Sequence, residues 1–251
     1  MEKEKNTASE INAKALSLIS HKFKTPLSII TGYTEAMLAQ VTKEKYSPFT
    51  AKALEEINQQ GDQLSKLLDK LEAFNRVLTA QQNGFQKQEI TLKPLIKECA
   101  AKAIEQEGDV FSVSPVGTEN TKKGTFVEID CPDHLSLHCN EEMLRLCIHE
   151  LIANAIKFNN KLEKNIKVQG TNHGDCISIS IRDYGTGIRP HDVDRIFETF
   201  YQVDDDFTGQ INGWGLGLPM VQRIVELHNG SISVVSDRGL GSIFTVNFPI
   251  L

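Results

Sequence analysis

Residues 176–188 have the sequence CISISIRDYGTGI, in which three isoleucines alternate with polar residues before a glycine-rich turn. An alternation with a period of two predicts a β-strand with one buried face, and it places Asp183 on that face at the end of the strand. A buried carboxylate needs hydrogen-bond donors, because its desolvation is otherwise costly. The amino group of adenine is such a donor, and Gly185 and Gly187 would let a flat ring approach the backbone.

Upstream, residues 149–158 have the sequence HELIANAIKF, which we expect to form a helix. Glu150, Asn154 and Lys157 are four and three residues apart, so they share one helix face. A carboxylate and an amide oxygen suit Mg²⁺ that also binds phosphate oxygens, and a lysine suits the phosphates themselves. A solvated polar stripe is the alternative explanation of this spacing.

Downstream, the sequence GWGLGLPMVQRIVELHNG (213–230) places three glycines before a predicted helix. Pro219 lies in the first turn of this helix, and Asn229 and Gly230 mark its end. The free backbone N–H groups of such a turn can bind an anion, although a turn that only caps the helix would have the same sequence. The polar stretch QVDDDFTGQIN (202–212) has the composition of a mobile lid.

The remaining segments predict a mixed sheet. SISVVS (231–236) and SIFTVNF (242–248) form a predicted hairpin with one apolar face. Residues 89–106 are expected to form a strand followed by a helix, and residues 125–130 a further strand. Helices would cover one side of this sheet, which gives an α/β sandwich in a chain of the α+β class.

The first third of the chain is predicted to be helical, because its apolar positions follow the alternating three-and-four spacing of a coiled-coil seam. Ser47 and Pro48 separate two such helices, which we expect to form an antiparallel hairpin. A single hairpin leaves apolar faces uncovered, so two copies should meet as a homodimeric four-helix bundle. The seam positions are Leu16, Ile19, Phe23, Leu27, Ile30, Thr34, Met37 and Val41 in the first helix, and Leu54, Ile57, Gly61, Leu64, Leu68, Leu71, Asn75 and Leu78 in the second.

One histidine, His21, lies in residues 1–83. It precedes the seam residue Phe23 by two positions and therefore points away from the seam into solvent. Thr25 shares this outward face, and Pro26 should bend the helix beside it.

Composition supports two domains with a boundary near Gly84. Residues 1–83 contain two of the 17 glycines and have a net charge of +1, whereas residues 84–251 contain the other 15 glycines and have a net charge of −7. This acidic balance argues against a nucleic-acid partner held by bulk positive charge. The five cysteines form no CxxC pair and no cluster with zinc spacing, which argues against disulfides and a structural metal.

The sequence also bears on location. It has no apolar run of the ~18 residues that a membrane helix needs and no signal peptide, so we expect a cytoplasmic segment without direct membrane contact. Its charged start predicts a helix that continues from an upstream segment, so we expect a fragment of a longer protein, which can include a membrane-bound part.

In chain order, five segments resemble the signature boxes of bacterial sensor histidine kinases, including those of hybrid two-component sensors. The segments are SHKFKTPL (20–27), HELIANAIKF (149–158), DYGTGI (183–188), IFETFYQ (196–202) and GWGLGL (213–218). The resemblance implies a dimerisation and histidine-phosphotransfer hairpin at 1–83. It further implies an ATP-binding domain at 84–251, of the type shared with gyrase and heat-shock ATPases.

The resemblance also implies roles for individual residues. His21 would accept the γ-phosphoryl group of Mg-ATP and pass it to an aspartate of a response-regulator receiver domain, with Thr25, Glu150 and Lys157 as the other catalytic residues. Glu150 and Asn154 would bind Mg²⁺, and Phe197 and Phe200 would anchor the lid. The implied ATP-binding residues are Asn154, Lys157, Phe158, Asp183, Gly185, Gly187, Gly213, Gly215, Leu216 and Gly217.

Three positions depart from the family pattern. Lys22 stands where an acid usually follows the phosphoacceptor, Glu150 where asparagine is more common, and Gln202 where arginine is common. A cation at position 22 favours neutral imidazole but cannot accept its proton. Two alternatives to an active autokinase therefore stay open. One is an autokinase-weak or phosphatase-biased dimeric scaffold, in which Thr25 positions water, and the other is a plain ATPase that uses Glu150.

Overall fold

The computed structural model describes residues 23–24, 27–39, 48–82, 84–106, 111–112, 124–203 and 214–250. The chain divides into two compact units, Met1–Thr79 and Ala80–Leu251, and each is described by itself below. Among the described residues, no helix combines the length and the hydropathy that crossing a membrane requires.

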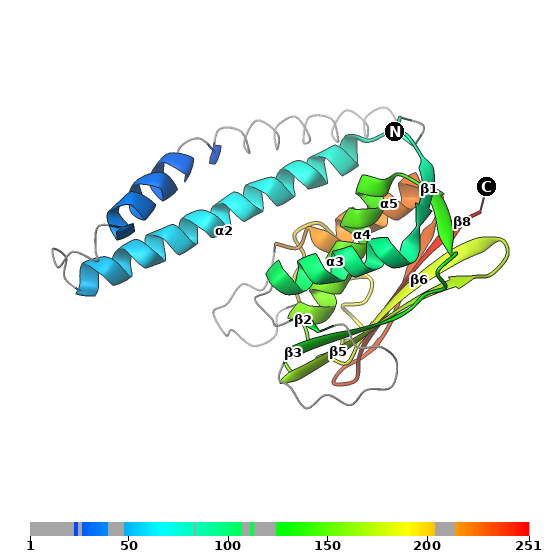
Figure 1. The fold of residues 1–251 in the computed structure, drawn as a ribbon. Helices are drawn as coiled ribbons and strands as arrows, with labels where there is room; N and C mark the ends of the chain where they lie inside the picture. Colours follow the sequence, from blue (N-terminus) through cyan, green and yellow to red (C-terminus); the bar gives the residue numbers. More distant parts are fainter. Residues whose placement is uncertain are drawn as a thin grey trace. The chain divides into compact units, whose positions relative to one another are not determined.

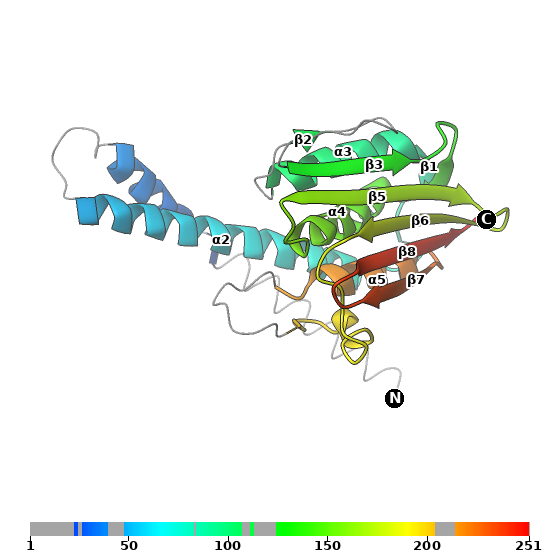
Figure 2. The same ribbon diagram turned by 90° about the horizontal axis from the view of Figure 1, so that it is seen from below.

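In the first unit, the helical residues 27–39 lie alongside α2 (Pro48–Thr79), as Figures 1 and 2 show. The two helices approach closely at Gly61, where an added Cβ would lie 3.1 Å from Cγ2 of Thr31. At one end of the hairpin, the ammonium of Lys24 lies 2.8 Å from carboxylate oxygens of both Asp69 and Glu72 on α2. The glycine therefore allows the close approach that its place in the seam predicts.

Only part of the apolar seam is covered within one copy of the hairpin. Leu27, Thr34, Leu54, Gly61 and Leu68 are buried. A second series of seam residues is exposed: Phe23, Ile30, Met37, Ile57 and Leu64.

The end of α2 differs from the predicted seam. Phe74 and Val77 are buried there, whereas the predicted seam residues Asn75 and Leu78 are only half-buried. Burial thus follows the more strongly apolar face, because phenylalanine gains more free energy from leaving water than asparagine does.

The second unit contains a six-stranded mixed sheet with the strand order β2-β3-β5-β6-β8-β7. The first three strands in this order are parallel and the others pair antiparallel. A separate antiparallel pair joins β1 (Gln88–Thr91) to β4 (Ser136–Cys139). The sheet strands are β2 (Phe111–Ser112), β3 (Gly124–Asp130), β5 (Glu163–Asn172), β6 (Cys176–Asp183), β7 (Ser231–Asp237) and β8 (Gly241–Pro249).

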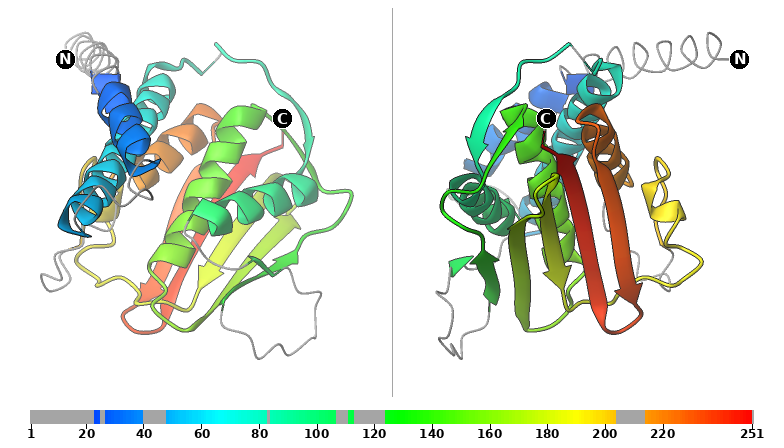
Figure 3. Two further views of the ribbon diagram at one scale, coloured as in Figure 1. Left: turned by 60° about the vertical axis from the view of Figure 1, so that its left-hand side comes forward. Right: turned by 90° about the vertical axis from the view of Figure 1, so that its right-hand side faces the viewer.

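Three helices cover one face of this sheet, as Figures 2 and 3 show: α3 (Leu92–Gln106), α4 (Glu141–Lys157) and α5 (Gly217–Leu227). The alternating isoleucines of β6 and the aromatic residues Phe244 and Phe248 of β8 are buried. The predicted α+β class, with a mixed sheet that helices cover on one side, is confirmed.

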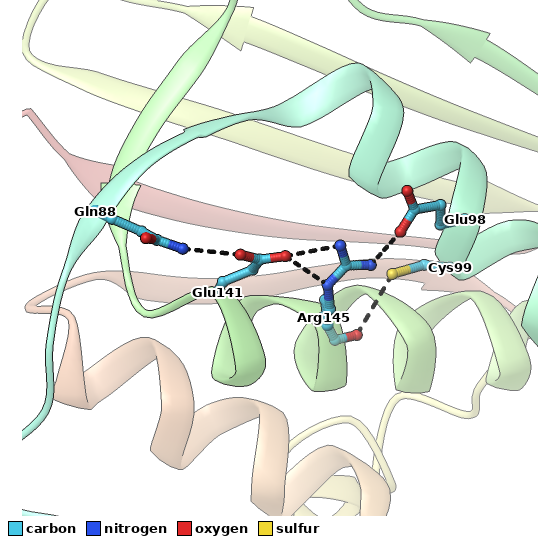
Figure 4. A network of polar contacts seen from close by, with 5 residues as sticks. All are labelled: Gln88, Glu98, Cys99, Glu141 and Arg145. Atoms are coloured by element: carbon cyan, nitrogen blue, oxygen red, sulfur yellow. Dashed lines mark hydrogen bonds and ion pairs between the residues drawn. The ribbon is translucent and has the colours of Figure 1, made fainter.

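A network of polar contacts holds the first half of α4 (Figure 4). Arg145 donates to Glu141 at 2.7 and 2.9 Å and also binds Glu98 of α3. Gln88 of β1 donates to the other carboxylate oxygen of Glu141 at 2.8 Å. The network joins β1, α3 and α4, and the second half of α4 contains the residues with a predicted function.

His228 joins the start of α4 to the end of α5. Its Nε2 accepts a hydrogen bond from the backbone N–H of Asn140, the N-cap of α4, at 3.1 Å, and its Nδ1 lies 2.8 Å from the carbonyl of Ile224. The ring also packs against Phe85 and Phe248. The end of α5 therefore lies beside the start of α4. The two helices run antiparallel, so the start of α5 points toward the second half of α4.

Candidate functional site

The second half of α4 presents the three polar residues that the sequence places on one face. Glu150 is buried and Asn154 is half-buried one turn further along. Lys157, the last residue of the helix, holds its ammonium 5.3 Å from the ring centroid of Phe158. Phe158 is the C-cap and is 46% exposed, so its ring can form a wall of a site open to solvent.

Asp183 is buried at the end of β6, as predicted. Its Oδ1 accepts hydrogen bonds from the backbone N–H of Gly185 at 2.8 Å and of Ser242 at 3.3 Å. Burial raises the pKa of Asp183, and these two backbone donors and the charge of Lys161 act in the opposite direction. The protein itself therefore supplies part of the hydrogen bonding that a buried carboxylate requires.

The loop after Asp183 is fixed to the end of α4. Thr186 donates to the carbonyl of Phe158 through its backbone N–H at 3.0 Å and its hydroxyl at 3.3 Å. A Cβ at position 185 would lie only 2.2 Å from that same carbonyl oxygen. The structure thus brings together two segments that are 25 residues or more apart in the sequence.

The structure gives these glycines a role in packing that the sequence did not suggest. A Cβ at Gly187, which has φ of 66°, would lie 2.0 Å from the carbonyl oxygen of Asp237. At both Gly185 and Gly187 the space of a side chain is filled by protein backbone. Glycine is required there because two chain segments pack together, and the approach of a flat ring remains a prediction.

The glycine-rich turn before α5 packs on the segment around Phe200. Gly215 has φ of 65°, and a Cβ there would lie 2.6 Å from the backbone of Phe200. The N–H of Phe200 donates to the carbonyl of Gly215 at 2.8 Å, while the Phe200 ring is exposed. Leu216 is fully buried as the N-cap of α5, which begins at Gly217. Phe200 therefore anchors its segment through its backbone rather than through its ring.

The same segment has a second attachment that the sequence did not reveal. The Tyr201 hydroxyl donates to the buried carboxylate of Asp192 at 2.5 Å, and the Arg195 guanidinium lies 4.2 Å from the centroid of the Tyr201 ring. Phe197, the other predicted anchor, is half-buried at the end of a short 3₁₀ helix (Arg195–Phe197) beside the buried Ile196. Asp192 and Tyr201 are nine residues apart within a loop, and no periodic pattern links them.

Some predicted site residues lie outside the described residues: His21, its neighbour Lys22, Thr25, Gly213 and most of the predicted lid at 202–212. Within the described part of the chain, no group of three or more histidine, cysteine or acidic side chains could hold a metal ion. One carboxylate and one amide oxygen, from Glu150 and Asn154, still suit Mg²⁺, which usually takes few protein ligands and completes its shell with phosphate oxygens and water.

Comparison with protein families identifies both units. Residues 12–79 match the model of the His Kinase A (phospho-acceptor) domain, and residues 139–251 match that of the histidine kinase-, DNA gyrase B- and HSP90-like ATPases. This chain is a histidine kinase core. The resemblance of its five sequence boxes to this family is thereby confirmed.

Individual histidine kinases match most of the chain. The phosphate regulon sensor protein PhoR of Pseudomonas aeruginosa is 26% identical over 92% of this chain and 48% of its own length. The sensor histidine kinase RppB of Synechocystis is 30% identical over 92% of the chain and 47% of its own length. The structure of full-length ShkA in complex with AMPPNP has a TM-score of 0.65 and 22% identity, covering 94% of this chain and 45% of ShkA. The chain thus spans about half the length of these relatives.

Proposed function

We propose that this histidine kinase core binds Mg-ATP in its second unit and transfers the γ-phosphoryl group to His21. The main support is the arrangement around the end of α4, where the carbonyl of Phe158 accepts hydrogen bonds from Thr186 in the loop that follows the buried Asp183. A buried acceptor for a purine amino group and a polar helix face suited to phosphates thereby lie at one end of the sheet. The AMPPNP bound by the similar protein ShkA supports the same ligand class.

In this proposal each residue of the site has one task. Asp183 accepts a hydrogen bond from the adenine amino group, and Phe158 forms a wall of the pocket. Lys157 contacts a phosphate, and Glu150 and Asn154 would hold Mg²⁺, which neutralises phosphate charge when bound. The backbone around Gly213, Gly215, Leu216 and Gly217 contacts phosphate oxygens at the start of α5.

The proposed reaction has two transfers. A nitrogen of neutral His21 forms a bond to the γ-phosphorus while the bond to the bridging oxygen breaks, and ADP leaves with that electron pair. The other ring nitrogen of His21 then releases its proton. An aspartate of a receiver domain next displaces the imidazole, which restores His21. Alignment and charge neutralisation supply most of the catalysis, as in phosphoryl transfer generally.

The proposed active form is a homodimer, in which the exposed seam residues of two hairpins cover one another. Ile30, Met37, Ile57 and Leu64 are spaced by seven residues within each helix and are exposed in one copy. Mutual burial of such side chains gains roughly 25 cal/mol per Å² of apolar surface. Analytical ultracentrifugation should give twice the chain mass of 28.0 kDa. Ile57→Glu should give the single mass, whereas Lys52→Glu, a charge change on the same helix outside the seam, should leave the dimer intact.

Incubation with γ-labelled ATP and Mg²⁺ tests the phosphoryl transfer. We expect a label that is stable to base and labile to acid, that disappears in His21→Gln, and that persists in the control His173→Gln. The label should move to a receiver domain when a set of purified receivers is added. Nucleotide binding without any label on His21 would refute the autokinase.

Lys22 supports a second candidate function. Because this cation stands where the family usually has an acid, autophosphorylation would be slow, and the hairpin would act mainly as a phosphatase-biased scaffold in which Thr25 positions water. Dephosphorylation of a labelled receiver domain that depends on Thr25, together with weak labelling of His21, would favour this function. Steady phosphate release without label on His21 would instead indicate a plain ATPase that uses Glu150.

A further inference from the structure

Ser236, on β7, makes three polar contacts through one hydroxyl group. Its Oγ accepts a hydrogen bond from the backbone N–H of Ile188 at 2.8 Å and donates to the carbonyl of Gly241 at 2.9 Å. It also lies 2.9 Å from Oγ of Ser242, and either hydroxyl can donate in that pair. Its partners belong to β8 and to the loop that follows Asp183.

These contacts are part of a wider junction between that loop and the β7–β8 turn. The N–H of Gly239 donates to the carbonyl of Thr186 at 2.7 Å. Gly187 lies so close to the carbonyl of Asp237 that a side chain would not fit between them. The loop over residues 185–188 is therefore held on one side by the end of α4 and on the other by the β7–β8 turn.

The junction reaches the carboxylate of Asp183 through Ser242. The backbone N–H of Ser242 donates to Oδ1 of Asp183 at 3.3 Å, which lowers the pKa of this carboxyl against the effect of burial. A path of contacts therefore leads from the loop to the carboxylate: Ile188 N–H donates to Ser236, the Ser236 hydroxyl lies 2.9 Å from that of Ser242, and the backbone N–H of Ser242 donates to Asp183.

We propose that Ser236 is a positioning residue for nucleotide binding, which orients Asp183 and the loop over 185–188 through this path of contacts. The inference rests on the proposed function, because it takes Asp183 as the group that binds the adenine base. Without the hydroxyl, Ile188 N–H and Ser242 lose a partner in a half-buried position, and the loop is no longer fixed on the side of the β7–β8 turn. Ser236 itself does not have to touch the nucleotide.

The variants Ser236→Thr and Ser236→Val separate the hydroxyl from the shape of the side chain. Threonine and valine are nearly isosteric and both favour strands, so both variants should fold. Calorimetric titration of the whole chain with ADP and Mg²⁺ should show Ser236→Thr within about twofold of the natural affinity. Ser236→Val should bind about tenfold more weakly, the scale expected when a partly buried N–H group loses its partner. Ser233→Ala, on the exposed side of the same strand, is the matched control and should bind as the natural chain does.

A merely structural serine would give a different result. If Ser236 only stabilised the fold, Ser236→Val would have a lower melting temperature than the natural chain but the same ADP affinity. That result would overturn the inference. In an Asp183→Asn background, the ADP affinities of the Ser236→Val and Ser236→Thr variants should differ by less than twofold, because Ser236 acts on binding through Asp183. An undiminished difference there would also overturn the inference. If the natural chain does not bind ADP at all, the proposed function fails instead.

Discussion

Replacement of Gly185 by alanine should separate the loop after Asp183 from the end of α4. The added Cβ would lie 2.2 Å from the carbonyl oxygen of Phe158 and 3.0 Å from Cα of Asn159. Both neighbours are backbone atoms, so no flexible side chain can move aside. The loop must shift by about 1 Å before the contact with the oxygen becomes acceptable, and the Thr186 hydrogen bond to the same carbonyl, 3.0 Å long, is strained or lost.

This shift allows an estimate of the loss of affinity. The shift also disturbs the hydrogen bond from Gly185 N–H to the Asp183 carboxylate, and a hydrogen bond to a charged group contributes roughly 1.5–3 kcal/mol, which corresponds to about 10- to 100-fold in affinity. The weakened Thr186 hydrogen bond adds about 1 kcal/mol to the cost in stability. We therefore expect Gly185→Ala to bind ADP and Mg²⁺ between about 10 and 100 times more weakly, with a fall of roughly 1–3 kcal/mol in the free energy of unfolding.

Calorimetric titration measures the affinity, and urea unfolding monitored by the fluorescence of the single tryptophan, Trp214, measures the stability. Gly174→Ala is the matched control. Gly174 has φ of 92° but no atom within 4 Å of an added Cβ, so this variant introduces backbone strain without a clash. It should lose about 1 kcal/mol of stability and keep its affinity. A folded Gly185→Ala protein with an affinity within threefold of the natural chain would refute the argument.

Three further predictions concern other parts of the chain. Burial lowers the pKa of His228 below its ordinary 6.5, so the unfolded chain takes up a proton that the folded chain does not, and stability should be lost as the pH falls below about 6.5, by up to ~1.4 kcal/mol per pH unit. Urea unfolding of His228→Gln between pH 7 and pH 5.5 should lack this component, and an unchanged pH dependence would contradict the assignment. Gly61→Leu should crowd Thr31 and lower the stability of the hairpin, followed by helical circular dichroism, by roughly 1–3 kcal/mol. Gly32→Leu, at a position with open space around it, should not, and equal losses would argue against the close helix contact. Lys22→Glu should accelerate labelling of His21 if the missing proton acceptor limits the rate, and an unchanged rate in single-turnover labelling would exclude that limit.

Local patterns predict much of this fold, because their physical cause lies within a few residues. The alternating isoleucines of β6 place Asp183 on the buried face, and the glycine, proline and asparagine signals around α5 match its observed ends. The pattern of β5 is weaker, because only Ile166 and Val168 alternate in it and charged residues surround them. The pairing of β1 with β4 depends on residues more than 40 positions apart, which no local period reveals.

The candidate site also combines features that a local pattern predicts with features that only the folded chain reveals. The spacing of Glu150, Asn154 and Lys157 follows from the helix itself, so the sequence predicts their common face. The reason for glycine at position 185 follows instead from the carbonyl of Phe158, which only the folded chain brings near. Ser236 belongs to an ordinary alternating strand, and its hydroxyl gains a role only because the loop at Ile188 lies against it.

The exposed series of seam residues in the hairpin makes stability depend on concentration. If a second copy is what covers Ile30, Met37, Ile57 and Leu64, each tenfold dilution of the chain lowers the free energy that pairing contributes by about 1.4 kcal/mol per dimer. The midpoint of thermal unfolding of the hairpin would then rise with protein concentration, while that of the nucleotide unit, whose core is complete in one copy, would stay constant. The number of copies in a cell would thus set how much of the hairpin is folded.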